Sequence, residues 1–100
     1  DFSKLKTIKI RSNTKWNYSY YPVIFESEKK LLEVQATLNQ MQIFPRRYFY
    51  PSLNKIEYLA ASEMIVSESI ASRVMCLPLY VGLSTSELNQ IITTINFALK

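Results

Sequence analysis

The residues best suited to chemistry stand together in one run, RRYFYP, at positions 46–51. An arginine can hold a phosphate or a carboxylate through two parallel hydrogen bonds, and a tyrosine offers both an aromatic face and a hydroxyl. The run could therefore bind a phosphorylated aromatic ligand such as a nucleotide. An aromatic strand that enters the core while its arginines stay in water explains the same residues equally well. The chemistry alone leaves both interpretations open.

Scarce residue types narrow the possible chemistry. The chain has no histidine and one cysteine, Cys76, so it lacks a histidine-based catalytic triad and a histidine or cysteine metal cluster. Gly82 is its only glycine, which excludes a glycine-rich phosphate loop. The eight acidic residues stand mostly near expected helix starts or on polar faces. We expect no metal site, and we interpret Cys76 as a small buried hydrophobic residue rather than a nucleophile.

Length and composition predict one folded domain. The chain has 100 residues, of which 48% are hydrophobic and 20% charged, as in a globular protein with a single core. Its longest uncharged stretch, residues 74–86, contains a proline and is shorter than the ~20 apolar residues of a membrane span. The single cysteine and the start at Asp1 without a leader favour a cytoplasmic location and a piece of a longer protein.

The net charge of +4 raises the question of a polyanionic partner. Basic residues cluster near the start of the chain, but they alternate with apolar ones. Lysines on the solvent side of an edge strand keep it soluble and prevent pairing with other chains. We therefore expect no nucleic-acid partner. The basic residues in question are Lys4, Lys6, Lys9, Arg11 and Lys15.

Two strands and a helix are predicted for the first half of the chain. Residues 4–11 and 18–25 are β-like and can pair antiparallel across the polar loop between them. Pro22 lacks an N–H, so we expect an edge position or a bulge there. Ser27 is suited to cap a helix. One apolar stripe at helical spacing follows it: Leu31, Val34, Leu38 and Met41.

The second half is predicted to add a strand and two helices. Residues 46–50 form a compact β-like segment. A helix begins near Ser67 and stops before Pro78, and residues 77–80 are extended. Ser84 and Glu87 form a capping box for a last helix. This order predicts an α+β fold with a small, mostly antiparallel sheet covered by helices. The apolar face of the last helix is Leu88, Ile91, Ile92, Ile95 and Leu99.

Four segments resemble, in their order, the C-terminal part of the DegT/DnrJ/EryC1/StrS aminotransferases. They are WNYSYYPVIF, IFPRRYFYPSLN, SESIASRVMCLPLYVGLS and the closing amphipathic helix. Each segment is weakly specific by itself, but together they cover nearly the whole chain at about the family's spacing. The sequence therefore resembles the small C-terminal domain of these enzymes.

The resemblance implies a fold-type-I aminotransferase whose large domain carries the lysine that binds pyridoxal 5′-phosphate. Residues 1–100 correspond to the small domain alone, so we expect this fragment to be inactive and to bind no cofactor covalently. Family members move an amino group, usually from glutamate, to a keto group of a nucleotide-linked deoxysugar, with the cofactor as electron sink. The implied partners are the nucleotide sugar, the protein's own large domain and a second subunit of a homodimer.

The matched turn implies a set of substrate-side residues but no catalytic one. Many relatives have Tyr-Phe-Tyr-Pro-Leu-His here, whereas Leu53 stands in place of that histidine. The Pro-Ser-Leu-Asn ending is similar to members that act on dTDP-4-keto-6-deoxyglucose. A stand-alone nucleotide- or RNA-binding module and a purely structural interaction domain remain the alternatives. The substrate-side residues are Arg47, Tyr48, Tyr50 and Asn54, with Phe49 and Pro51 shaping the turn.

Overall fold

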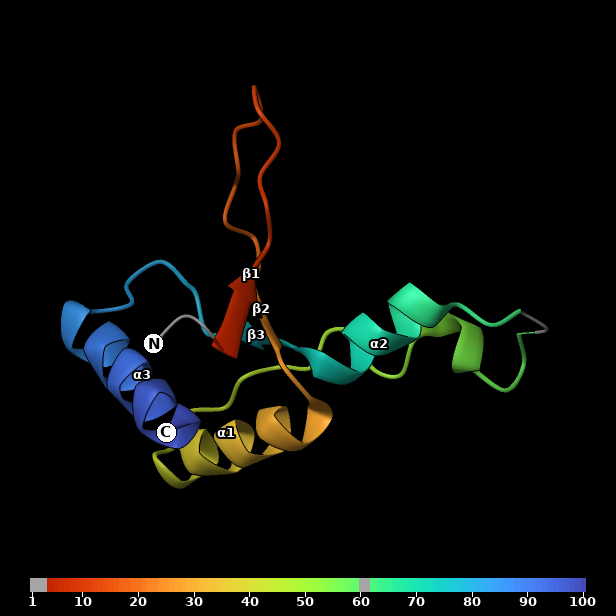
Figure 1. Cartoon of the computed structure of the whole chain (residues 1–100). Helices are drawn as coiled ribbons and strands as arrows, with labels where there is room; N and C mark the ends of the chain where they lie inside the picture. The colour runs from red at the N-terminus through yellow and green to blue at the C-terminus, as the bar shows by residue number, and fades with distance from the viewer. Residues whose placement is uncertain (1–3, 60–61) are drawn as a thin grey trace.

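In the computed structural model, which describes residues 4–59 and 62–100, a small antiparallel sheet lies beside a pair of packed helices (Figure 1). The strand order is β1-β2-β3, and α1 packs against α3. This arrangement confirms the predicted α+β class. The elements are β1 (Leu5–Thr7), β2 (Tyr21–Phe25), α1 (Glu28–Gln40), the 3₁₀ turn η2 (Leu53–Lys55), α2 (Ile65–Arg73), β3 (Val74–Leu77) and α3 (Thr85–Leu99).

The core lies between the sheet and the helices α1 and α3. Apolar side chains from β2, β3, α1 and α3 are buried there, and this burial is the main source of stability for a domain of this size. Phe25, Leu31 and Met75 are fully buried. The rest of the core cluster is Val23, Val34, Leu38, Ile91, Ile95 and Leu99.

The first two strands pair antiparallel as predicted, but they are shorter than residues 4–11 and 18–25. Leu5 pairs with Phe25 and Thr7 with Val23, and the pairing stops there. Residues 8–20 continue as a hairpin arm that projects from the sheet (Figure 1). Nearly every side chain of the arm is exposed, so its β-favouring residues have no surface against which to pack.

Pro22 shows why the central strand tolerates a proline. It pairs with Cys76 of β3, whose own N–H and C=O bond to Arg46 on the far side. The nitrogen of Pro22 therefore faces the β1 side, where β1 has already ended at Thr7. The strand is locally an edge at Pro22, in agreement with the expectation from the missing N–H.

Both capped helices follow the sequence pattern. The Ser27 hydroxyl accepts from Lys30 N at 3.2 Å, and the Ser84–Glu87 capping box is formed in both directions. Met41 was expected on the apolar stripe of α1, but it is 48% exposed because the helix ends at Gln40 and Met41 is its C-cap. Of the predicted apolar face of α3, Leu88 and Ile92 are also exposed.

The segment between α1 and α3 differs most from the prediction. Residues 46–50 are not a strand: only Arg46 bridges to β3. The third strand is instead Val74–Leu77: the prediction of a helix is wrong for residues 74–76, and the prediction of an extended backbone is confirmed for Leu77. Val74 is β-branched, and the run VMCL is buried against β2, so tertiary packing selects a strand there. Helix α2 begins at Ile65, slightly before the predicted start near Ser67.

Candidate functional site

The arginine and aromatic run begins beside β3 and then leaves the sheet. Arg46 N donates to Cys76 O at 3.0 Å, and Cys76 N donates to Arg46 O at 2.7 Å. The backbone then turns through two cis peptide bonds, Tyr48–Phe49 and Tyr50–Pro51. Successive side chains of an extended backbone point to opposite sides, so Arg46 and its neighbour Arg47 enter different surroundings.

Arg47 is occupied by contacts within the domain. Its Nη2 lies 3.0 Å from Glu28 Oε1 and donates to Ser72 O at 3.1 Å. Its guanidinium carbon lies 3.8 Å from the centre of the Tyr50 ring, within cation–π distance. Only 17% of the side chain is exposed. Arg47 therefore ties the start of α1, the end of α2 and the turn together.

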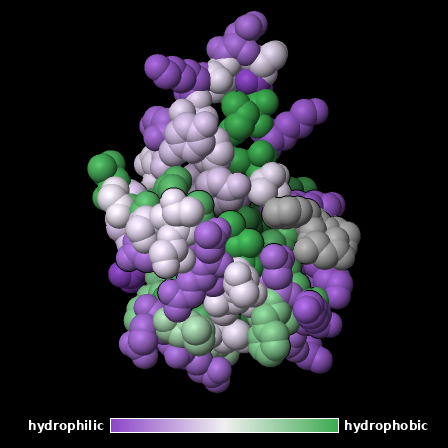
Figure 2. All heavy atoms as spheres, turned by 90° about the vertical axis from the view of Figure 1, so that its left-hand side faces the viewer, coloured by the Kyte–Doolittle hydropathy of each residue, from purple (hydrophilic) through white to green (hydrophobic). Residues whose placement is uncertain are grey.

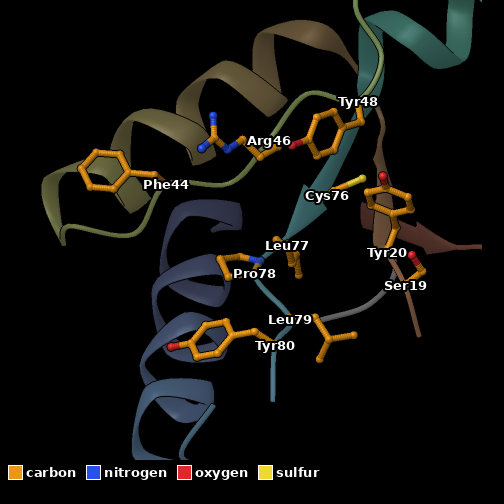
Figure 3. A pocket seen from close by; sticks show the side chains of 10 residues that line it. All are labelled: Ser19, Tyr20, Phe44, Arg46, Tyr48, Cys76, Leu77, Pro78, Leu79 and Tyr80. Atoms are coloured by element: carbon orange, nitrogen blue, oxygen red, sulfur yellow. The ribbon is translucent and has the colours of Figure 1, made fainter. Parts of the chain in front are cut away.

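Arg46, unlike Arg47, lines a cavity of about 280 Å³. Figure 3 shows Tyr20 and Tyr48 beside Cys76, with Arg46 between Phe44 and Tyr48 and with Tyr80 at the far end. The lining holds one cation and no acid, so the cavity favours an anionic group. Ligand cavities usually measure roughly 300–1,000 Å³, so this one fits part of a nucleotide-sized ligand. The remaining lining residues are Ser19, Leu77, Pro78 and Leu79.

Aromatic rings form one wall of this cavity. The rings of Tyr20 and Tyr48 meet edge to face with 5.5 Å between centres, and Phe49 packs on Tyr48 at 5.4 Å. Such pairs hold each other's orientation. Both tyrosines remain about half exposed, so their faces are accessible to a flat ligand.

The structure separates the four residues expected on the substrate side. Tyr48 lines the cavity, whereas Arg47 and Tyr50 contact each other away from its lining. Asn54 lies in η2, and its side-chain amide donates to Ser62 O at 3.3 Å. Of the residues expected to shape the turn, Pro51 follows one cis bond and Phe49 the other.

Three cavity residues were not among the expected substrate-side residues: Arg46, Tyr20 and Tyr80. Arg46 stands in the recognised run, and alternation along an extended backbone gave a reason to separate it from Arg47. Tyr20 stands in the tyrosine-rich segment before β2, and Tyr80 follows β3. Only the pairing of β3 with Tyr21 and Arg46 brings these three segments together.

Cys76 forms part of the cavity wall but is almost completely buried. Burial raises the pKa of its thiol, while a hydrogen bond from the Tyr48 backbone lowers it to a smaller extent. The thiol is therefore neutral at physiological pH, and a neutral thiol is a poor nucleophile. The interpretation of Cys76 as a buried hydrophobic residue is confirmed for its position in the fold.

A second, mostly apolar cavity of about 450 Å³ lies between the sheet and α3. Figure 2 shows hydrophobic surface in the hollow below the hairpin arm, whose far end is hydrophilic. Leu88 and Ile92, the exposed members of the α3 face, line this cavity. The predicted apolar face of α3 is thus real, but four of its five residues line this groove and two of those four are exposed.

The lysines of the described residues lie outside the linings of both cavities. Lys4 donates to Leu99 O, and Lys30 and Lys55 pair with carboxylates. In the part of the chain that the structure describes, no group of three acidic, cysteine or histidine side chains could hold a metal. Its helices are also too short or too polar to cross a membrane.

The fold is that of solved aminotransferase structures. An aminotransferase from Streptoalloteichus hindustanus, TlmJ, superposes with a TM-score of 0.87 over 97% of this chain at 19% identity. A DegT DnrJ EryC1 StrS aminotransferase from Brucella abortus gives a TM-score of 0.79 over 97% at 23% identity. The chain covers 26% and 27% of these two proteins.

Residues 1–96 match the DegT/DnrJ/EryC1/StrS aminotransferase family, and the chain belongs to it. A dTDP-4-amino-4,6-dideoxy-D-glucose transaminase of Shigella dysenteriae is 39% identical over 85 residues, which are 79% of this chain. An enzyme of the same name from Escherichia coli is 32% identical over 80 residues, which are 72% of this chain. The chain spans only 23% and 22% of these relatives.

Proposed function

We propose that this chain is the C-terminal small domain of a nucleotide-sugar aminotransferase. The enzyme transfers the amino group of glutamate to the C4 keto group of dTDP-4-keto-6-deoxyglucose. Glutamate is oxidised to 2-oxoglutarate while the carbonyl carbon is reduced to the amine-bearing carbon, so no further oxidant or reductant is needed. The identity of 39% to a dTDP-4-amino-4,6-dideoxy-D-glucose transaminase carries this proposal, because that name contains both the nucleotide and the aminated position.

The small domain contributes binding surface rather than the reacting amine. Pyridoxal phosphate, when bound by the complete enzyme, supplies the electron sink for amino transfer. The described lysines lie outside both cavities, which supports a lysine from a separate large domain. Alone, residues 1–100 are inactive in this proposal. The 280 Å³ cavity with Arg46 and Tyr48 then forms one side of the substrate site, which the large domain completes.

Exposed apolar side chains support the presence of another domain or subunit that covers them. The segment around η2 and the start of α2 projects from the body (Figure 1), and Tyr58, Ile65 and Val66 in it are at least 75% exposed. The groove between the sheet and α3 is also apolar. Surfaces of this kind mark interaction sites when they are contiguous. We assign them to the large domain and to the second subunit of a homodimer, in a cytoplasmic enzyme.

The test uses the longest protein that contains these residues. It is purified with pyridoxal phosphate and incubated with glutamate and dTDP-4-keto-6-deoxyglucose. The products are separated by ion-exchange chromatography and identified by mass spectrometry. A dTDP-4-amino-4,6-dideoxyhexose formed in step with 2-oxoglutarate is the expected result. The corresponding 3-keto sugar is the matched control. Turnover of the 3-keto sugar alone would contradict the assignment of C4.

A further inference from the structure

Arg46 and Arg47 are neighbours in the chain, but only one of them is available to a ligand. The guanidinium of Arg47 is taken up by Glu28, the carbonyl of Ser72 and the ring of Tyr50. The side chain of Arg46 is exposed and makes no hydrogen bond or ion pair within residues 4–59 and 62–100. Arg46 is therefore the free cation of the pair.

The position of Arg46 is fixed even though its guanidinium is free. Two backbone hydrogen bonds to Cys76, of 3.0 and 2.7 Å, hold it against the buried strand β3. Because the backbone is already ordered, a ligand orders only the side chain, which lowers the entropic cost of binding. The same cavity contains the edge-to-face rings of Tyr20 and Tyr48 and no acidic residue. These features suit a ligand that carries phosphate next to a flat ring.

We infer that Arg46 binds the diphosphate of the nucleotide sugar, whereas Arg47 holds the turn in shape. An arginine can engage a phosphate through two parallel hydrogen bonds, which gives both affinity and orientation. The role rests on the proposed function, since that function supplies the diphosphate. An arginine can also bind the carboxylates of glutamate, so the glutamate half-reaction separates the two roles: an Arg46 that binds the diphosphate acts on the sugar half alone.

The experiment compares Arg46→Gln with wild type in the full-length protein loaded with pyridoxal phosphate. Arg11→Gln, on the exposed hairpin arm, is the matched control because it removes the same charge elsewhere. Calorimetry gives the Kd of dTDP and of thymidine, which lacks phosphate. Steady-state kinetics give KM for the keto sugar, and absorbance of the cofactor follows the glutamate half-reaction.

Arg46→Gln is expected to raise the Kd of dTDP and KM of the keto sugar at least about tenfold, the factor for one lost hydrogen bond to a charged group. The thymidine Kd, the glutamate half-reaction and Tm stay at wild-type values, and Arg46→Lys restores part of the affinity. An unchanged dTDP affinity, or an equal loss for dTDP and thymidine, would overturn the role of Arg46. Wild-type protein that binds dTDP through Arg46 without transferring an amino group would refute the proposed function and leave this role intact.

Discussion

Arg47 and Glu28 join two parts of the chain that lie 19 residues apart, with Nη2 of Arg47 3.0 Å from Oε1 of Glu28. The carboxylate belongs to the first turn of α1, where a negative charge also favours the helix. The same nitrogen reaches Ser72 O at the end of α2. One side chain thus connects both helices to the aromatic turn, which gives Arg47 a role in the fold that its sequence position did not indicate.

Replacing Arg47 by leucine should destabilise the domain by about 2 kcal/mol, because it removes two partly buried hydrogen bonds of a charged group and leaves Ser72 O without this donor. Urea unfolding followed by circular dichroism measures the change. Arg46→Leu is the control and should stay within about 0.5 kcal/mol of wild type, as exposed substitutions usually do. Equal losses in both variants would remove the distinction between the two arginines.

Leu31 and Leu32 offer a matched pair on α1. Leu31 is fully buried in the core, and Leu32 is 48% exposed. Truncating Leu31 to alanine leaves a cavity and should cost about 2–5 kcal/mol, as buried leucines do. The same change at Leu32 should cost far less, because water already reaches that side chain. Chemical denaturation of both variants checks the order, and a larger loss at Leu32 would contradict the packing of α1.

Ser84→Ala should destabilise α3 by about 1 kcal/mol, the usual effect of losing an N-cap hydroxyl. Ser86→Ala is the control, since Ser86 is exposed in the first turn of the helix and takes no part in the capping box. Thermal unfolding by circular dichroism compares the two. A Ser86 variant that loses as much as the Ser84 variant would show that the cap contributes nothing.

The same cap gives stability a pH dependence. A hydrogen bond with the Ser84 backbone, and to a smaller extent one with the Ser84 side chain, lowers the pKa of Glu87 below its ordinary range. A lowered carboxylate pKa adds stability that is present above the unfolded pKa and is lost as pH falls through the folded one. Glu87→Gln should therefore flatten the acid limb of the stability curve, measured as Tm against pH. An unchanged acid limb would contradict this contribution.

Cys76 should resist alkylation in the folded protein. Burial blocks access and raises the pKa of its thiol, so little thiolate exists at neutral pH. Iodoacetamide labelling followed by intact mass should be slow in buffer and fast in urea. Because the folded state holds the thiol proton more tightly, Cys76 should also reduce stability as pH rises above the unfolded pKa of the thiol. Fast labelling of the folded protein would contradict the burial.

Local patterns predicted the parts of the fold that depend on neighbours in sequence. The cap at Ser27, the capping box of Ser84 and the buried positions of α1 all follow from residues within one or two turns. The antiparallel pairing of the first two strands followed in the same way. Their lengths did not, because the extent of a strand depends on the surface available to bury it.

The third strand and the cavity depend on distant pairing. Residues 74–76 were expected to be helical because their apolar side chains follow the periodic run of α2, but β2 provides a buried edge on which β3 forms. Arg46 then joins that strand through Cys76 and turns toward the cavity. The sequence showed which run held the arginines, while the partners of Arg47 decided which of the two is free.

The most direct test follows labelled nitrogen from donor to sugar. The longest protein that contains residues 1–100, and residues 1–100 alone, are each incubated with pyridoxal phosphate, ¹⁵N-glutamate and dTDP-4-keto-6-deoxyglucose. The long protein is expected to place ¹⁵N on C4 of the sugar, seen by NMR and mass spectrometry, and the 100 residues alone to form no labelled sugar. Labelled amino sugar from the 100 residues alone, or none from the long protein, would contradict assignment as the small domain of a sugar aminotransferase.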